Sequence, residues 1–231
     1  VSIMAVNNEV GTVMPIKEIS SLMKKQSKAV LHIDAVQAVG KVEVNYNDAD
    51  LITVSLHKLG GLKSSGLLLK RKTVDLAPQI LGGGQEAGFR SGTNDTPMAI
   101  VSAIAVKHAF VGMKKRYTYV KELVTPIYKY LSSSDFAVNS DISNPFIVNF
   151  STLHKKASVI TEALAMNGIM VASKSACSSK ADKGSHVLVA MSRNEQVCKN
   201  SIRLSLNEYN TKEEVRIFIR ALKRIMNEVK A

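Results

Sequence analysis

The chain has 231 residues, of which 45% are hydrophobic and 22% are charged, as in most packed soluble proteins. No apolar run approaches the length that crosses a membrane, and two cysteines are too few for a disulfide framework. The net charge of +12 would favour a nucleic-acid partner if the basic residues clustered, but they are scattered. We therefore expect no nucleic-acid partner and no membrane partner. Because Cys and His do not recur at ligand spacing, we also expect no metal site.

The first third of the chain alternates strands with a helix. Apolar runs predict strands over residues 1–6, 29–35 and 49–56, and a fourth strand over residues 66–71 that returns close to the third. Pro15 suits the first position of a helix whose apolar residues recur at helical spacing. Near-continuous apolar strands separated by helices predict a mostly parallel sheet that is covered on both faces.

A glycine-rich loop over residues 81–94 separates this region from the rest of the chain. Thr96, as a cap, and Pro97 then predict one long helix that runs to about Leu131. Further strands are expected over 146–150 and 202–206, and further helices over 158–166 and after a capping box formed by Thr211 and Glu214.

The order of these elements predicts two domains. A boundary near residue 115, inside the long helix, divides an incomplete α/β large-domain portion (1–115) from a smaller C-terminal α+β domain (116–231).

Polar residues follow the three strands that we expect to be parallel, at the strand ends where open α/β sheets bind ligands. They are Asn7, Asn8 and Glu9, then Asp34 and Gln37, then Ser55, His57 and Lys58. Pyridoxal 5'-phosphate (PLP) needs a lysine amine and a carboxylate that keeps its pyridine nitrogen protonated, and Lys58 and Asp34 can supply them. Taken singly, each residue is more often a turn former, a solvated charge or a structural histidine.

Six motifs together are much more specific than any single residue. In chain order they are VNNE, HIDAVQ, SLHK, GGGQEAGFRSGT, SKSAC and RLSL, and they extend across nearly the whole chain. In these motifs the chain resembles the class V aminotransferase family, and within it the cysteine desulfurases. The resemblance implies a PLP-transferase type I (aspartate aminotransferase-like) fold, with a large-domain remnant and a small C-terminal domain.

The resemblance also implies roles for five residues around PLP. Lys58 would hold PLP and then shuttle the α-proton of the substrate. Asp34 would pair with the pyridinium nitrogen, and Gln37 would donate to the ring hydroxyl. Ser55 and His57 would bind the phosphate.

Three more residues match family positions outside this group. Thr93 would reach the phosphate of the neighbouring subunit's cofactor, which implies a homodimer. Asn8 and Arg203 would hold the substrate carboxylate, Arg203 by a two-pronged contact that a lysine does not reproduce.

Cys177 is the residue that favours a desulfurase over other family members. A persulfide-forming cysteine must be accessible to attack sulfur, and Cys177 lies among serines and lysines typical of a surface loop. Lys174 and Lys180 would favour its thiolate. Cys198 has no such context, which indicates a structural or incidental residue.

The chain departs from the family pattern in several places. Leu62 and Ser64 replace a Pro and a Gly after the lysine, Leu81 stands where a His often precedes the glycine triplet, and Lys174 replaces a Gly. Full-length members also carry a long segment before VNNE, with the helix that cradles the phosphate and a histidine that stacks on the pyridine ring. The chain is therefore expected to be a C-terminal portion that is inactive alone.

The expected function is PLP-dependent conversion of L-cysteine to L-alanine, with the sulfur passed to Cys177 and then to an acceptor or scaffold protein. That sulfur would serve iron–sulfur cluster or thio-cofactor assembly, in the cytoplasm or an organellar matrix. An aminotransferase, a selenocysteine lyase and a non-catalytic scaffold remain as alternatives.

Overall fold

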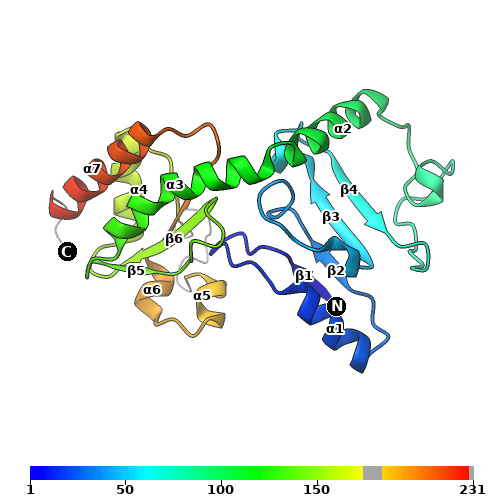
Figure 1. Cartoon of the computed structure of the whole chain (residues 1–231), viewed down its shortest axis with the longest axis horizontal. Coiled ribbons are helices and arrows are strands. Elements are labelled where there is room, and N and C mark those ends of the chain that lie inside the picture. Colours follow the sequence, from blue (N-terminus) through cyan, green and yellow to red (C-terminus); the bar gives the residue numbers. More distant parts are fainter. Residues whose placement is uncertain (174–183, 229–231) are drawn as a thin grey trace. The chain divides into compact units, whose positions relative to one another are not determined.

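The computed structural model describes residues 1–173 and 184–228, which form two compact units (Figure 1). Unit 1 comprises Val1–Val6 and Met14–Met113, and unit 2 comprises Asn7–Val13 and Lys114–Ala231. The segment Asn7–Val13 therefore groups with unit 2, although the sequence assigns it to the first domain. The domains at 1–115 and 116–231 stay a prediction, because compactness does not show that each folds independently.

Unit 1 is an α/β unit built on one four-stranded sheet. Its elements are β1 (Ser2–Met4), α1 (Ile16–Gln26), β2 (His32–Asp34), β3 (Leu51–Ser55), β4 (Gly66–Lys70) and α2 (Thr96–Phe110), with short 3-10 helices η1 (Tyr46–Asp48), η2 (Leu56–Leu59) and η3 (Glu86–Gly88). The strand order is β1-β2-β3-β4, with β1, β2 and β3 parallel and β4 antiparallel to β3. The predicted α/β class with a mostly parallel sheet is confirmed.

The two faces of this sheet differ in polarity because successive side chains of a strand alternate. Ile33 and Val54 are buried on one face. On the other face, Ser2 Oγ lies 2.7 Å from Nδ1 of His32, and His32 Nε2 lies 3.2 Å from Oγ1 of Thr53. This face therefore carries polar side chains within strands that the sequence predicts to be near-continuously apolar. Asp34, two residues after His32, lies on the same polar face.

The long helix predicted from Thr96 to about Leu131 is in fact two helices. Val111 has an extended backbone at the end of α2, and Gly112 follows with φ of +71°. The start of α2 also differs from the prediction. Asp95 is the cap, since its Oδ1 accepts a hydrogen bond from Met98 N at 2.9 Å.

Unit 2 contains one antiparallel sheet with helices packed on it. Its elements are α3 (Met113–Leu131), β5 (Phe136–Val138), β6 (Ile147–Thr152), α4 (Ala157–Met166), β7 (Ala172–Ser173), α5 (His186–Ala190), α6 (Glu195–Lys199), β8 (Ser201–Ser205) and α7 (Lys212–Glu228). The strand order is β5-β6-β8-β7. The predicted helix at 158–166 and its stop at Asn167 and Gly168 are confirmed, the latter with φ of +74°.

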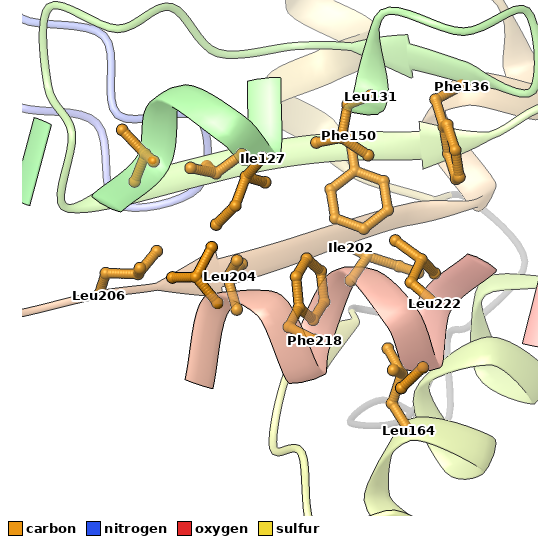
Figure 2. Close-up of a cluster of buried hydrophobic side chains, with 14 of the residues drawn as sticks. Ile127, Leu131, Phe136, Phe150, Leu164, Ile202, Leu204, Leu206, Phe218 and Leu222 are labelled. Atoms are coloured by element: carbon orange, nitrogen blue, oxygen red, sulfur yellow. The ribbon is translucent and has the colours of Figure 1, made fainter. Parts of the chain in front are cut away.

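The core of unit 2 is formed by apolar side chains from the sheet and from α3, α4 and α7. In Figure 2 the rings of Phe150 on β6 and Phe218 on α7 point into the same cluster. The predicted capping box at the start of α7 is confirmed. Thr211 N donates to Oε2 of Glu214 at 2.7 Å, and Glu214 N donates to Oγ1 of Thr211 at 3.2 Å. The bond from Thr211 N lowers the pKa of the Glu214 carboxyl.

Within residues 1–173 and 184–228, no single helix has the length and apolar composition to span a membrane. The pair formed by α2 and α3, separated by a break, meets that test by length and composition when taken together.

Candidate active site

Asp34 lies at the carboxyl end of β2, beside β3. Its Oδ1 accepts a hydrogen bond from Val36 N at 2.9 Å, which turns the chain away from the strand. The next backbone amide, Ala35 N, donates to Thr53 O at 2.9 Å, and Asp34 pairs with Thr53 in the sheet. Strand β3 then continues for two residues beyond Thr53, to Ser55. Because β2 and β3 are parallel, Asp34 and Ser55 lie at the same edge of the sheet, where such sheets bind ligands.

Ser55 is the last residue of β3 and directly precedes the turn η2, which carries His57 and Lys58. Ser55 Oγ is 2.9 Å from Nδ1 of His57, and the side chains of His57 and Lys58 are exposed. Between them Leu56 is fully buried and anchors the turn to unit 1.

Glycines close this turn. Gly60 has φ of +83°, and a Cβ added at Gly61 would lie 2.9 Å from the Leu56 carbonyl oxygen. The sequence therefore needs glycine at both positions to turn back toward β4 after Lys58.

Gln37 lies in the turn that follows β2, and its Oε1 accepts a hydrogen bond from Lys41 Nζ at 3.1 Å. Thr93 is exposed in the 81–94 loop, which the structure confirms to be mainly irregular. In that loop Gly92, with φ of +128°, donates its N–H to Oε1 of Gln85 at 3.1 Å. The structure therefore places Gln37 after the strand that carries Asp34, and Thr93 on a separate loop.

Asn8 and Arg203 come together in unit 2, although they lie far apart in the sequence. Arg203, on β8, donates from its Nη1 to the backbone oxygen of Asn8 at 3.0 Å. Its Nε is buried and has no hydrogen-bond partner among the residues that the structure describes. A buried guanidinium N–H without a partner is unfavourable, so this arrangement favours an acceptor that binds there. These two residues belong to unit 2, whereas Asp34 and Lys58 belong to unit 1.

The two cysteines differ in what can be said of them. Cys177 lies outside the described residues. Cys198 is 2% exposed, and its Sγ donates to Arg193 O at 3.4 Å. Burial raises the pKa of the Cys198 thiol, which makes it a weaker nucleophile at neutral pH.

Sequence reasoning gave no role to Glu9, although it noted the residue beside Asn8. Glu9 is 7% exposed, and its carboxyl accepts a hydrogen bond from Ser185 Oγ at 2.5 Å. The VNNE motif was the available signal, but the partner lies 176 residues later and is visible only in the folded chain. Among the described residues, no group of three or more His, Cys, Asp and Glu is arranged to hold a metal.

Unit 1 has a mostly parallel sheet, and the turn η2 with Lys58 follows the carboxyl end of β3. This is a fold of the PLP-transferase type. The chain belongs to the class-V aminotransferase family, whose sequence model matches residues 1–218.

Its relatives carry a narrower name. The chain is 35% identical to "Cysteine desulfurase IscS" of Dictyoglomus turgidum over 236 residues, which covers 100% of this chain and 60% of that protein. It is 34% identical to "Cysteine desulfurase, mitochondrial" of Saccharomyces cerevisiae, covering 96% of this chain and 46% of that protein.

Solved structures show the same relationship. A NifS-like protein superposes with a TM-score of 0.89 at 31% identity, covering 99% of this chain and 61% of the other. A NifS-like protein from Rickettsia africae gives a TM-score of 0.87 at 29% identity, covering 98% and 61%. The chain thus spans about 60% of these proteins.

The family depends on PLP, and the side chains in unit 1 fit that cofactor. The turn η2 offers an exposed amine on Lys58 beside the Ser55–His57 pair, and the adjacent strand end offers the carboxyl of Asp34. An amine, a carboxyl and fixed hydrogen-bonding groups are the set that a phosphorylated pyridine aldehyde requires.

Proposed function

We propose that the chain carries the lysine and the substrate-binding residues of a PLP-dependent cysteine desulfurase, which converts L-cysteine to L-alanine. The observation that carries this proposal is the Ser55–His57–Lys58 turn beside Asp34, at the shared edge of two parallel strands. The proposal is further supported by the names of the two sequence relatives reported above, which are both called cysteine desulfurase. When bound, PLP supplies an electron sink that stabilises negative charge at the substrate α-carbon.

Each proposed cofactor contact follows from the chemistry of the side chain. The Lys58 amine binds the cofactor and moves the substrate α-proton at its Nζ. Asp34 stabilises a protonated pyridine nitrogen, and Gln37 donates to the ring hydroxyl. Ser55 and His57 bind the phosphate, and their contact with each other fixes their orientation before it arrives.

Substrate recognition is proposed for Asn8 and Arg203. A guanidinium presents a planar set of N–H donors that matches a carboxylate, and Arg203 has Nε buried and unpaired among the described residues. The α-carboxylate of L-cysteine is the acceptor we propose for it. A lysine at position 203 would supply charge without the same geometry.

The sulfur step uses Cys177, which lies outside the described residues. We propose that its thiolate attacks the substrate sulfur, so that a sulfur–sulfur bond forms and the substrate carbon–sulfur bond breaks. The β-carbon that has lost sulfur accepts a proton, and the product leaves as L-alanine. Cys177 keeps the sulfur as a persulfide. Atoms and electrons balance without any added oxidant.

We also propose a homodimer, in which Thr93 contacts the phosphate bound by the neighbouring subunit. The persulfide sulfur then passes to an acceptor or scaffold protein for iron–sulfur cluster or thio-cofactor assembly. The cytoplasm is the proposed compartment, or an organellar matrix, in line with the relatives named mitochondrial.

The test is product formation by the protein expressed from its complete coding sequence, with PLP. L-cysteine should yield equal amounts of L-alanine and persulfide, and mass spectrometry should place the persulfide on Cys177. Cys177→Ala should lose sulfur release and keep PLP, while the matched Cys198→Ala should keep both. Alanine formed only from L-selenocysteine would indicate a selenocysteine lyase, and amino-group transfer without sulfur release would indicate an aminotransferase. Neither product with PLP bound would indicate a non-catalytic scaffold.

A further inference from the structure

The segment Asn7–Val13 is held in unit 2 by side chains that bind its backbone oxygens. Asn149 donates from Nδ2 to Glu9 O at 3.0 Å, and Asn144 donates from Nδ2 to Gly11 O at 3.1 Å. Arg203 Nη1 donates to Asn8 O at 3.0 Å. The guanidinium of Arg203 therefore takes its position in part from this segment.

The side chain of Glu9 adds a fourth attachment of this segment to unit 2. It is 7% exposed, and its Oε2 accepts from Ser185 Oγ at 2.5 Å, while Oε1 lies 3.8 Å from Nδ1 of His186. Ser185 is itself fixed, because its N–H donates to Cys198 O at 2.9 Å and its Oγ caps α5 by accepting from Leu188 N at 3.2 Å. A buried carboxyl is costly unless it is bonded in this way.

These contacts connect Glu9 to the two proposed substrate residues without direct contact to substrate. Asn8 is its neighbour in the chain, and Arg203 binds the peptide oxygen between them. A displacement of about 1 Å in a binding group can cost a large factor in rate or affinity. The bond from Ser185 to Glu9 is therefore connected to Asn8 through one peptide unit, and to Arg203 through the oxygen of that unit.

We propose that Glu9 is a positioning residue that, through Ser185, orients Asn8 and Arg203 for the carboxylate of an amino-acid substrate. This inference rests on the proposed function, in which Asn8 and Arg203 bind that carboxylate. In this proposal the hydrogen bond from Ser185 orients the two residues, and the negative charge of Glu9 does not. Glu9→Gln separates the two effects, because glutamine keeps an acceptor oxygen for Ser185 and lacks the charge.

The experiment measures KM for L-cysteine, kcat and the PLP absorbance spectrum of the protein expressed from its complete coding sequence. Glu9→Ala should raise KM about tenfold with little change in kcat or in the spectrum, because the cofactor residues lie in unit 1. Glu9→Gln should stay within about threefold of the parent. Ser185→Ala should reproduce the rise in KM although Ser185 touches neither Asn8 nor substrate in this scheme, and the double variant should be no worse than either single one.

Tyr119→Phe is the matched control. The Tyr119 hydroxyl donates to Asn210 O at 2.7 Å, so its loss perturbs unit 2 without removing any of the hydrogen bonds that hold Asn7–Val13 or Ser185. It should leave KM within about twofold. A KM that Glu9→Ala and Ser185→Ala leave unchanged would overturn the inference, as would equal rises in KM for Tyr119→Phe.

Arg203→Lys separates this inference from the proposed function. It should raise KM because lysine lacks the planar fork. An unchanged KM for Arg203→Lys contradicts the proposed role of Arg203 in substrate binding. A raised KM for Arg203→Lys beside normal values for Glu9→Ala and Ser185→Ala contradicts only the role of Glu9.

Discussion

Ser55 Oγ and His57 Nδ1 lie 2.9 Å apart on the turn that leads into Lys58. The residue between them, Leu56, is fully buried and anchors the turn to unit 1, while the side chains of His57 and Lys58 are exposed. Groups that are already oriented lose less entropy when a ligand binds. This turn is the best-defined part of the candidate cofactor site, and its lysine can be tested without measuring turnover.

Lys58→Ala should abolish the PLP absorbance in the near-visible range and the borohydride-reducible adduct, because no amine remains at the end of β3. The measurement uses the protein expressed from its complete coding sequence, with the adduct located by peptide mapping. Lys63→Ala is the matched control, since Lys63 is an exposed lysine of the following turn. An adduct that persists in Lys58→Ala and maps to another lysine would show that the cofactor residue is misassigned.

The two cysteines should differ in reactivity toward iodoacetamide. The thiolate is the reactive form, and burial raises the pKa of Cys198, so its labelling at pH 7 should be slow and should accelerate as the pH rises. Cys177, flanked by lysines in the sequence, should react faster at neutral pH. Peptide mass spectrometry over a time course at pH 7 and pH 9 gives both rates. Labelling of Cys198 at pH 7 as fast as in the urea-unfolded protein would contradict its burial.

Thr211→Ala should lower the free energy of unfolding by about 1 kcal/mol, the usual cost of losing a helix cap. The structural reason is the bond from Glu214 N to Thr211 Oγ1. Urea denaturation measures the change. Thr125→Ala is the control, because Thr125 is exposed within α3 and alanine is the better helix former there. Equal losses in the two variants would contradict a specific cap.

The same capping box predicts a dependence on acid. The pKa of Glu214 is lowered in the folded chain by the Thr211 N–H, so its contribution is complete above the pKa of an unfolded glutamate. As the pH falls through the lower folded value, the contribution is lost. The difference in stability between the parent and Glu214→Gln should therefore shrink below about pH 4. A difference that is constant from pH 7 to pH 3 would contradict this account.

Features encoded within a few residues were predictable from the sequence. The capping box at Thr211 and the stop at Gly168 are local signals, and both were found as predicted. The start of α2 was not, because Asp95 and Thr96 are adjacent residues that both suit a cap, and only the bond to Met98 N decides between them. The break at Gly112 was missed because the residues on both sides suit a helix and a single glycine inside a helix costs only about 1 kcal/mol.

The candidate site divides in the same way. The strand-end positions of Asp34 and Lys58 followed from the alternation of strands and helices. The grouping of Asn7–Val13 with unit 2 did not, because it depends on Asn149 and Arg203, which lie 140 and 195 residues from their partners. A sequence pattern carries no signal of that range, so the environment of Glu9 became visible only in the fold.

Tyr46→Phe should stabilise the chain at alkaline pH. The Tyr46 hydroxyl is buried without a hydrogen-bond partner among the described residues, and burial raises its pKa from 10.0 to about 12. The unfolded chain therefore loses this proton first, and the parent should lose about 1.4 kcal/mol of stability per pH unit between pH 10 and 12 through this group.

The Tyr46→Phe variant should not show this loss of stability between pH 10 and 12. Near pH 7 its free energy of unfolding should equal or slightly exceed that of the parent, because the substitution removes no buried hydrogen bond. Urea denaturation of both chains from pH 8 to pH 11 checks the prediction. Tyr128→Phe is the contrasting variant. The hydroxyl of Tyr128 donates to Asp141 O at 2.9 Å, so its removal should cost stability already at pH 7. A parallel pH dependence for the parent and Tyr46→Phe would contradict the raised pKa.

The 231-residue chain by itself should self-associate through β4. Leu67, Leu68 and Leu69 are 39%, 51% and 49% exposed, and β4 forms one edge of the sheet among the described strands. An edge strand with exposed apolar side chains on both faces is a template for pairing with another chain. Leu68→Lys places a charge on that edge and should lower the association, measured as weight-average mass by sedimentation or light scattering over a concentration series.

Leu22→Lys is the control for this last prediction. Leu22 is 56% exposed on α1, so the substitution adds the same charge to an equally exposed leucine that is not on the strand edge. It should leave the average mass close to that of the parent. Equal effects of the two substitutions would attribute the association to net charge rather than to β4. A chain that stays monomeric at every concentration would contradict the edge as an association site, because the exposed leucines would then be tolerated in water without a partner.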